Sequence, residues 1–167
     1  IPVYTPLRTD EADVSGGRVF YGALNVFLEQ RSALFRRLPR WLTSWLDSPW
    51  LLRRLARGDS TIDPRLLGAL TTSMLEGEAG HQARELERLD AWLRRDFRPE
   101  VVVLSNSLLL GMARRLRADL GVPVVCELQG EEIFLDELPG EHRRRVLALM
   151  RERAAEVDAF VAPSAFY

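Results

Sequence analysis

The spacing of apolar residues predicts helices in the first part of the chain. A helical period runs over residues 20–35 and ends at Pro39, and a second runs over residues 41–57, where Pro49 disturbs it. Residues 8–18 are polar and contain two adjacent glycines, which is typical of a loop. The sequence therefore predicts a loop followed by two helical segments.

A third helical pattern begins at Asp63-Pro64, where an acid can cap the first turn and proline suits the first helical position. Apolar residues then recur at helical spacing until Pro99 stops the pattern. Gly77 and Gly80 interrupt it, so the sequence predicts either two helices or one kinked helix in this region.

The last third of the chain alternates between apolar runs and amphipathic stretches. Strands are predicted over residues 101–105, 122–128 and 158–163, with helices over residues 107–121 and 141–157 between them. Strands and helices that alternate with short links favour parallel strand pairing. We therefore expect an α/β fold with a Rossmann-like parallel sheet flanked by helices.

Composition limits the size and the chemistry of the protein. With 167 residues, 47% of them hydrophobic, the chain can bury one substantial core, so residues 1–167 are expected to form a single domain. The net charge of -1 argues against nucleic-acid binding. All 23 basic residues are arginine, which excludes a phosphate-loop lysine and a lysine general base. Because Ile1 and Tyr167 stand in or just after strand-like sequence, we expect a piece truncated at both ends.

Several motifs of catalysis and metal binding are absent from the sequence, among them those of dinucleotide-binding proteins, serine hydrolases and zinc proteases. Two histidines, His81 and His142, and one cysteine make a poor metal set, so no metal site is expected. His142 stands beside arginines and is expected at the surface. Cys126 lies in an apolar run without a disulfide partner, which predicts a buried structural thiol and a cytoplasmic location.

Polar residues follow each of the three predicted strands. Residues 105–107 read Ser-Asn-Ser, residues 129–132 read Gln-Gly-Glu-Glu, and residues 163–164 read Pro-Ser. Ligands of open parallel sheets bind outside the carboxyl ends of the strands, where these groups should meet. The amides of Asn106 and Gln129 can hydrogen-bond sugar hydroxyls both as donors and as acceptors.

Helix capping is the competing explanation for the same residues. Asn106 or Ser107 can cap the helix that follows them. Glu131 and Glu132 suit the first turn of a short helix, where the helix dipole favours negative charge. The residues alone leave capping and ligand binding both open.

Four stretches together resemble a known enzyme family. They read TPLRTDEADVSGGRVFYGALNVFLEQ, MLEGEAGHQARELERLDAWL, RPEVVVLSNSLLLGMARRLRADLGVPVVCELQGEEIF and VDAFVAPSAFY. In order and spacing they are similar to the N-terminal, acceptor-side domain of family 4 retaining glycosyltransferases, which have the two-domain GT-B fold. The resemblance covers nearly the whole chain, although no single stretch is diagnostic.

The resemblance implies a hexosyltransferase-like enzyme that uses a nucleotide-sugar donor and a sugar or lipid-linked acceptor. The donor is a substrate, and no separate cofactor is implied. In this family the C-terminal domain of the same protein holds most donor contacts, including two glutamates eight positions apart. This chain has no such pair, so the chain alone is expected to be inactive.

The resemblance also assigns site residues. Gln129 falls where many members have a histidine near the reaction centre, but a glutamine cannot carry a proton at neutral pH. General-base catalysis by Gln129 is therefore not expected, and the leaving phosphate is expected to assist deprotonation of the acceptor. The expected substrate-binding residues are Gly16 and Gly17, which match a flexible acceptor-side loop, together with Asn106, Gln129, Gly130, Glu131 and Glu132.

A basic segment, Arg31–Arg57, holds seven arginines, three tryptophans and one acid. Such a segment suits the inner face of a membrane, but its tryptophans can equally pack onto the domain or form a protein interface. Two functions therefore remain as alternatives to the enzyme. One is a non-catalytic α/β module that binds a small ligand at the strand ends, and the other is a membrane-surface or interaction domain that uses Arg31–Arg57.

Overall fold

The computed structural model describes residues 64–165, together with residues 20, 21, 26, 28–30, 32, 34 and 35. Contacts between residues divide the chain into two compact units, one built of Ile62–Tyr167 and the other of Pro2–Thr61. In the smaller unit, residues 26 and 28–30 are helical, in agreement with the helix predicted over residues 20–35. The loop predicted over residues 8–18 and the helix predicted over residues 41–57 lie outside the described residues.

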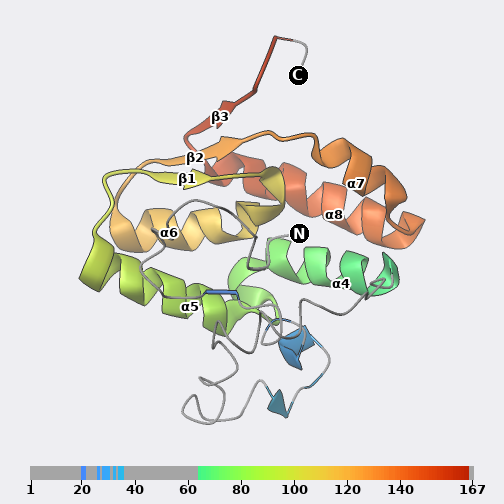
Figure 1. Cartoon of the computed structure of the whole chain (residues 1–167), viewed down its shortest axis with the longest axis horizontal. Helices are drawn as coiled ribbons and strands as arrows, with labels where there is room; N and C mark the ends of the chain where they lie inside the picture. Colours follow the sequence, from blue (N-terminus) through green and yellow to red (C-terminus); the bar gives the residue numbers. More distant parts are fainter. Residues whose placement is uncertain are drawn as a thin grey trace, which may run out of the picture. The chain divides into compact units, whose positions relative to one another are not determined.

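The larger unit contains a parallel sheet of three strands, β1 (Val102–Leu104), β2 (Val124–Glu127) and β3 (Ala159–Val161), in that order (Figure 1). In the register, Val103 pairs with Val125, and Cys126 pairs with Phe160. The three strands and their parallel pairing confirm the prediction from the sequence.

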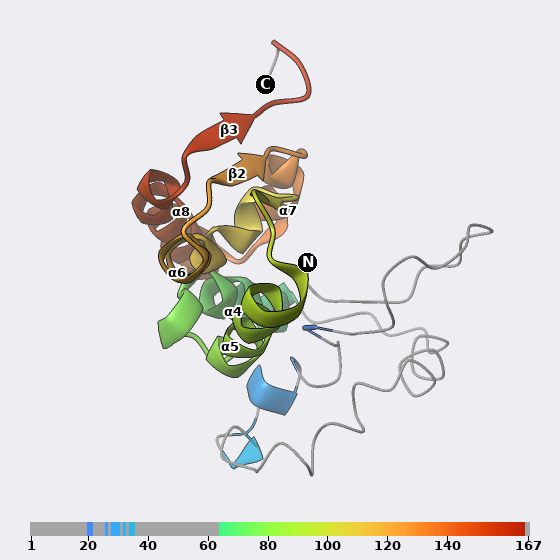
Figure 2. The same ribbon diagram turned by 90° about the vertical axis from the view of Figure 1, so that its left-hand side faces the viewer.

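The helices of the larger unit lie on one side of this sheet (Figures 1 and 2). Between β1 and β2 runs α6 (Ala113–Leu120), and before β3 runs α8 (Gly140–Arg153). Beneath them, α4 (Pro64–Leu75) packs against α8, and α5 (Ala83–Trp92) packs against α6. The unit therefore has the predicted α/β architecture, a parallel sheet flanked by helices.

The pattern that begins at Pro64 forms two helices rather than one kinked helix. A short 3-10 turn, Gly77–Ala79, separates α4 from α5. Gly77 has a φ of 59°, and a Cβ added to it would collide with the carbonyl oxygen of Gly111. After α5 the chain continues as a π turn, Leu93–Phe97, and leaves it through Arg98, which has left-handed backbone angles (φ 50°, ψ 66°) directly before Pro99.

The helix predicted over residues 107–121 differs from the observed one in its first half. The segment Ser107–Met112 is a 3-10 helix, and regular α-helix begins only at Ala113. Within the 3-10 part the backbone of Gly111 lies against the end of α4, where a Cβ would collide with the carbonyl oxygen of Met74. The end was predicted correctly, because Gly121 caps α6 with a left-handed φ of 67°.

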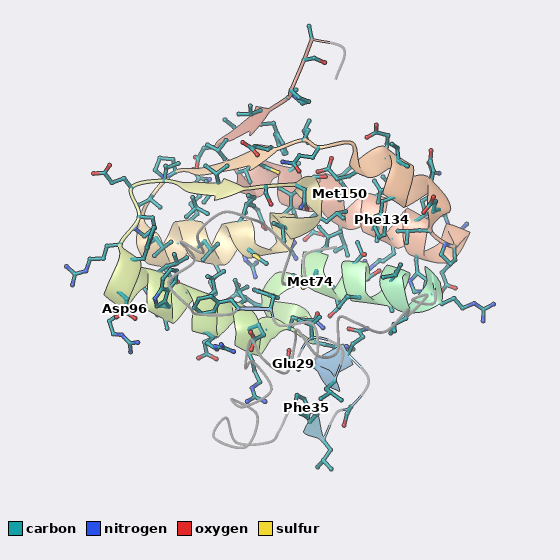
Figure 3. All side chains as sticks on the ribbon, in the orientation of Figure 1. Glu29, Phe35, Met74, Asp96, Phe134 and Met150 are labelled. Carbon is teal, nitrogen blue, oxygen red and sulfur yellow. The ribbon has the colours of Figure 1, made fainter. Side chains whose placement is uncertain are left out.

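The core lies between the sheet and the helices. Buried side chains from the sheet and from the helices meet there, among them Leu75, Leu104, Val124, Cys126 and Val146. The half-buried side chains of Phe134 and Met150 pack against this cluster (Figure 3). Cys126 is completely buried, as predicted. On the opposite face of the sheet, apolar side chains remain accessible, with Val103 53% and Val161 49% exposed.

One surface prediction was wrong. His142, expected as a solvated group on α8, is half-buried and lies over Gly68 of α4. A Cβ added to Gly68 would lie 2.6 Å from the Cγ atom of His142. The missing side chain at residue 68 is therefore what allows the imidazole to lie between the two helices.

Candidate functional site

The polar residues that follow β1 and β2 lie at the same end of the sheet, because the two strands are parallel neighbours (Figure 1). After β1 the chain passes through Asn106 into the 3-10 helix, and after β2 it passes through Gln129 and Gly130 into α7 (Glu131–Glu137). The sequence prediction that these strand ends carry polar groups to one edge is confirmed. We refer to Asn106, Ser107, Gln129, Glu131 and their backbone groups as the strand-end site.

Asn106 caps the helical segment after β1. Its backbone is extended, with φ of -165° and ψ of 163°, and its Oδ1 atom accepts the N–H of Leu108 at 3.1 Å. The capping explanation is therefore confirmed for this residue. Capping occupies only the amide oxygen, and the amide nitrogen of Asn106 has no hydrogen bond to the described residues.

Gly130 forms the turn after β2. Its φ of 85° and ψ of 30° are left-handed, a conformation that glycine adopts without steric cost. The turn allows α7 to begin at once with Glu131 and Glu132, as predicted for a short helix with acids in its first turn. Glu132 is exposed.

Glu131 connects the two strand ends. Its Oε1 atom accepts the N–H of Ser107 at 2.6 Å, and its Oε2 atom accepts the N–H of Gln129 at 2.9 Å. Burial raises the pKa of this carboxyl group. Hydrogen bonds from Ser107, from Gln129 and from its own backbone lower the pKa by more than burial raises it, so the pKa lies below the ordinary value. Glu131 is therefore held as a carboxylate by several N–H dipoles.

Gln129 is exposed, and its side-chain amide is held by a second acid. The Nε2 atom donates to the Oε2 atom of Glu127 at 3.3 Å. The amide oxygen has no partner within the described part of the chain and can accept a hydrogen bond from a ligand. Gln129 thus has its backbone bound by Glu131 and its side chain by Glu127.

The thiol of Cys126 lies close to Glu127 and Glu131 of this site but is unreactive. Burial raises its pKa to about 11, and the negative charges of Glu131 and Glu127 raise it in the same direction. A thiol with this pKa is almost entirely protonated at neutral pH and is a poor nucleophile. Cys126 therefore fits the structural role predicted for it.

Other features predicted from the sequence cannot be placed relative to this site. Gly16, Gly17 and all the arginines and tryptophans of the basic segment Arg31–Arg57 fall outside the described residues. Within the described residues, His, Cys, Asp and Glu form no group that could hold a metal ion, and no helix is long and apolar enough to cross a membrane.

Nearly the whole chain, residues 5–167, matches a family described as glycosyl transferase 4-like domain. The chain belongs to this family. Neither a curated protein nor a solved structure gives a significant match. The parallel sheet flanked by helices is consistent with one half of the GT-B fold. The family match supports a glycosyltransferase-type function.

Sequence reasoning missed two roles in this glycosyl transferase 4-like domain. Glu127 was not selected at all, and Glu131 was considered only as a ligand-binding or helix-starting acid. The sequence held a signal for both roles, because Glu127 stands two residues before Gln129 and Glu131 two residues after it, close enough to hydrogen-bond it. The role of Ser107 could not be read in this way, since its N–H meets Glu131 across 24 residues of sequence.

Proposed function

We propose that the chain is the acceptor-binding half of a nucleotide-sugar-dependent hexosyltransferase that retains the configuration of the anomeric carbon. The observation that carries this proposal is the strand-end site, where the loops after two neighbouring parallel strands each carry one amide side chain, Asn106 and Gln129. Asn106 can donate to a ligand through its amide nitrogen, and Gln129 can accept through its amide oxygen. Because each hydroxyl of a sugar can both donate and accept, one donor and one acceptor can together bind two neighbouring hydroxyls.

Gln129 orients the acceptor hydroxyl and takes no proton, since an amide does not titrate near neutral pH. The acceptor oxygen bonds to the anomeric carbon on the same face from which the phosphate oxygen departs. The proton of the acceptor hydroxyl passes to the leaving phosphate, and the nucleoside diphosphate carries it away. Glu132 at the start of α7 and the backbone of Gly130 contribute further acceptor contacts.

The donor binds mainly to a second domain of the same protein, so the chain alone does not transfer sugar. In the proposed enzyme, Gly16 and Gly17 form an acceptor-side loop, and Arg31–Arg57 contacts the membrane from which a lipid-linked acceptor is taken. A buried thiol without a disulfide partner in the chain suits a cytoplasmic protein engaged in carbohydrate biosynthesis.

Incubation of the full-length protein with a panel of UDP-, GDP- and ADP-sugars tests this function. Transfer or donor hydrolysis with one of them, with retained anomeric configuration in the product by NMR, is the expected result. An inverted product contradicts the retaining mechanism. The absence of both transfer and hydrolysis with every donor favours a non-catalytic module that binds a small ligand at the same strand ends.

A further inference from the structure

We propose that Glu131 is a positioning residue: its carboxylate holds the strand ends of β1 and β2 at a fixed spacing and thereby orients the two amides that bind the acceptor. The inference rests on the proposed function, because the oriented groups are the ones assigned to the acceptor. It changes the role of Glu131 from a residue that touches the ligand to one that acts through Ser107 and Gln129.

The geometry shows one carboxylate divided between two loops. Oε1 accepts the N–H of Ser107 at 2.6 Å, and Oε2 accepts the N–H of Gln129 at 2.9 Å. Such short distances between nitrogen and a carboxylate oxygen are typical of strong, charge-assisted hydrogen bonds. Because Ser107 and Gln129 belong to loops that follow different strands, the carboxylate fixes the distance between those loops.

A glutamate is required for this contact. Ser107 is only 4% exposed, so its N–H has little access to water and needs a partner within the protein. A glutamine at residue 131 would accept with one atom but direct an NH2 group at the other N–H. An aspartate would keep the charge, but its side chain is one methylene shorter and cannot reach both loops from the same backbone position.

The two positioned amides stand directly beside this contact. Asn106 precedes Ser107 in the chain, and its amide oxygen is used in capping, so it presents a donor. Gln129 is itself bound through its N–H, its amide nitrogen is used by Glu127, and it presents an acceptor. Glu131 therefore sets the separation between one donor and one acceptor, which has to match two hydroxyls of one sugar.

Ion pairing does not explain the position of Glu131. Within residues 64–165 its carboxylate forms no salt bridge, and each oxygen accepts a backbone N–H. Glu132, the next residue, is exposed. The two neighbouring acids thus have different tasks, Glu131 within the protein and Glu132 at its surface.

The test uses the full-length protein with Glu131→Gln, Glu131→Asp and a control, Glu137→Gln, which makes the same charge change at the exposed end of α7. Amide hydrogen exchange followed by NMR is the first measurement. In Glu131→Gln we expect the N–H groups of Ser107 and Gln129 to exchange about tenfold faster or more, while those of β2 remain protected. Glu131→Asp keeps the charge and is expected to affect Ser107 more than Gln129.

Sugar-transfer kinetics on the same variants are the second measurement. Glu131→Gln is expected to raise the acceptor KM about tenfold or more and to leave the donor KM unchanged, since the donor binds to the other domain. Glu131→Asp should fall between this variant and the wild type, and Glu137→Gln should match the wild type. A purely structural role would lower the amount of active enzyme without changing the acceptor KM.

Two outcomes overturn the inference. Unchanged exchange at Ser107 and Gln129 in both variants would show that the contact does not hold the loops. Faster exchange with a wild-type acceptor KM would show that the contact has no part in acceptor binding. Failure of the wild-type protein to transfer any sugar would instead overturn the proposed function, and faster exchange in the variants would then still establish the contact.

Discussion

Asp158 and Val124 exchange two hydrogen bonds at the start of neighbouring strands. The N–H of Val124 donates to the Oδ2 atom of Asp158 at 2.9 Å, and the N–H of Asp158 donates to the carbonyl oxygen of Val124 at 2.8 Å. Arg117 of α6 pairs with the same carboxylate at 2.7 Å. The end of the sheet opposite the strand-end site is therefore fixed by one acid that joins β2, β3 and α6.

Replacement of Asp158 by alanine should lower the free energy of unfolding by about 1–3 kcal/mol, because the N–H of the fully buried Val124 loses its partner. Chemical denaturation measures this change. Asp136→Ala is the control, since its carboxylate pairs with Arg143 while 67% exposed, and its loss should cost less than about 1 kcal/mol. Equal losses in the two variants would contradict the structural role of Asp158.

The close approach of Gly111 to the end of α4 predicts a steric effect. Gly111→Ala would place a Cβ against the carbonyl oxygen of Met74 and should destabilise the protein by about 1–3 kcal/mol or more. Gly140→Ala is the matched control. Its Cβ would have only Arg144 nearby, at 3.9 Å, so its stability should stay unchanged or rise by up to about 1 kcal/mol. Thermal unfolding that ranks the two variants in the opposite order would rule out the close contact.

The lowered pKa of Glu131 predicts a specific acid sensitivity. Because the folded-state pKa lies below the ordinary value of 4.5, the stabilisation is present above pH 4.5 and is lost as pH falls through the folded-state pKa. Glu131→Gln should therefore lose less stability than the wild type on acidification, with Glu137→Gln as the control. Urea denaturation at a series of pH values below neutrality measures this difference, and parallel curves for wild type and Glu131→Gln would refute the prediction.

The raised pKa of Cys126 predicts that its thiol reacts slowly with alkylating reagents. With a pKa of about 11 and a completely buried side chain, Cys126 in the folded protein should resist alkylation at mildly alkaline pH. The same reagent should modify it rapidly in denaturant. Mass spectrometry of the tryptic peptide follows both reactions, and rapid modification of the folded protein would indicate an accessible, ionised thiol.

Regular elements of the larger unit could be predicted from the sequence because local patterns determine them. Val-rich runs predicted β1 and β2, a short apolar run around Phe160 predicted β3, and Gly121 marked the end of α6. The 3-10 geometry of Ser107–Met112 could not be predicted, since it accompanies the close approach of Gly111 to Met74, a contact across 37 residues. The half-buried position of His142 depends in the same way on Gly68 in another helix.

The strand-end site was predictable only in part. The rule for parallel sheets placed Asn106 and Gln129 at one edge, and capping by Asn106 followed from its residue type. Which atoms remain for a ligand depends on two hydrogen bonds formed after folding. The amide nitrogen of Gln129 donates to Glu127, and the amide oxygen of Asn106 accepts the N–H of Leu108. The roles of Gly16, Gly17 and the basic segment Arg31–Arg57 remain predictions, because both glycines and all the arginines and tryptophans of the segment lie outside the described residues.

Sugar transfer by the full-length protein, compared between wild type and Gln129→Ala, is the most direct test of the account. Loss of the acceptor contact should reduce turnover about tenfold or more with the donor that the wild type uses, and Glu137→Ala should match the wild type. Turnover by Gln129→Ala at the wild-type rate would contradict the assignment of the strand-end site to the acceptor.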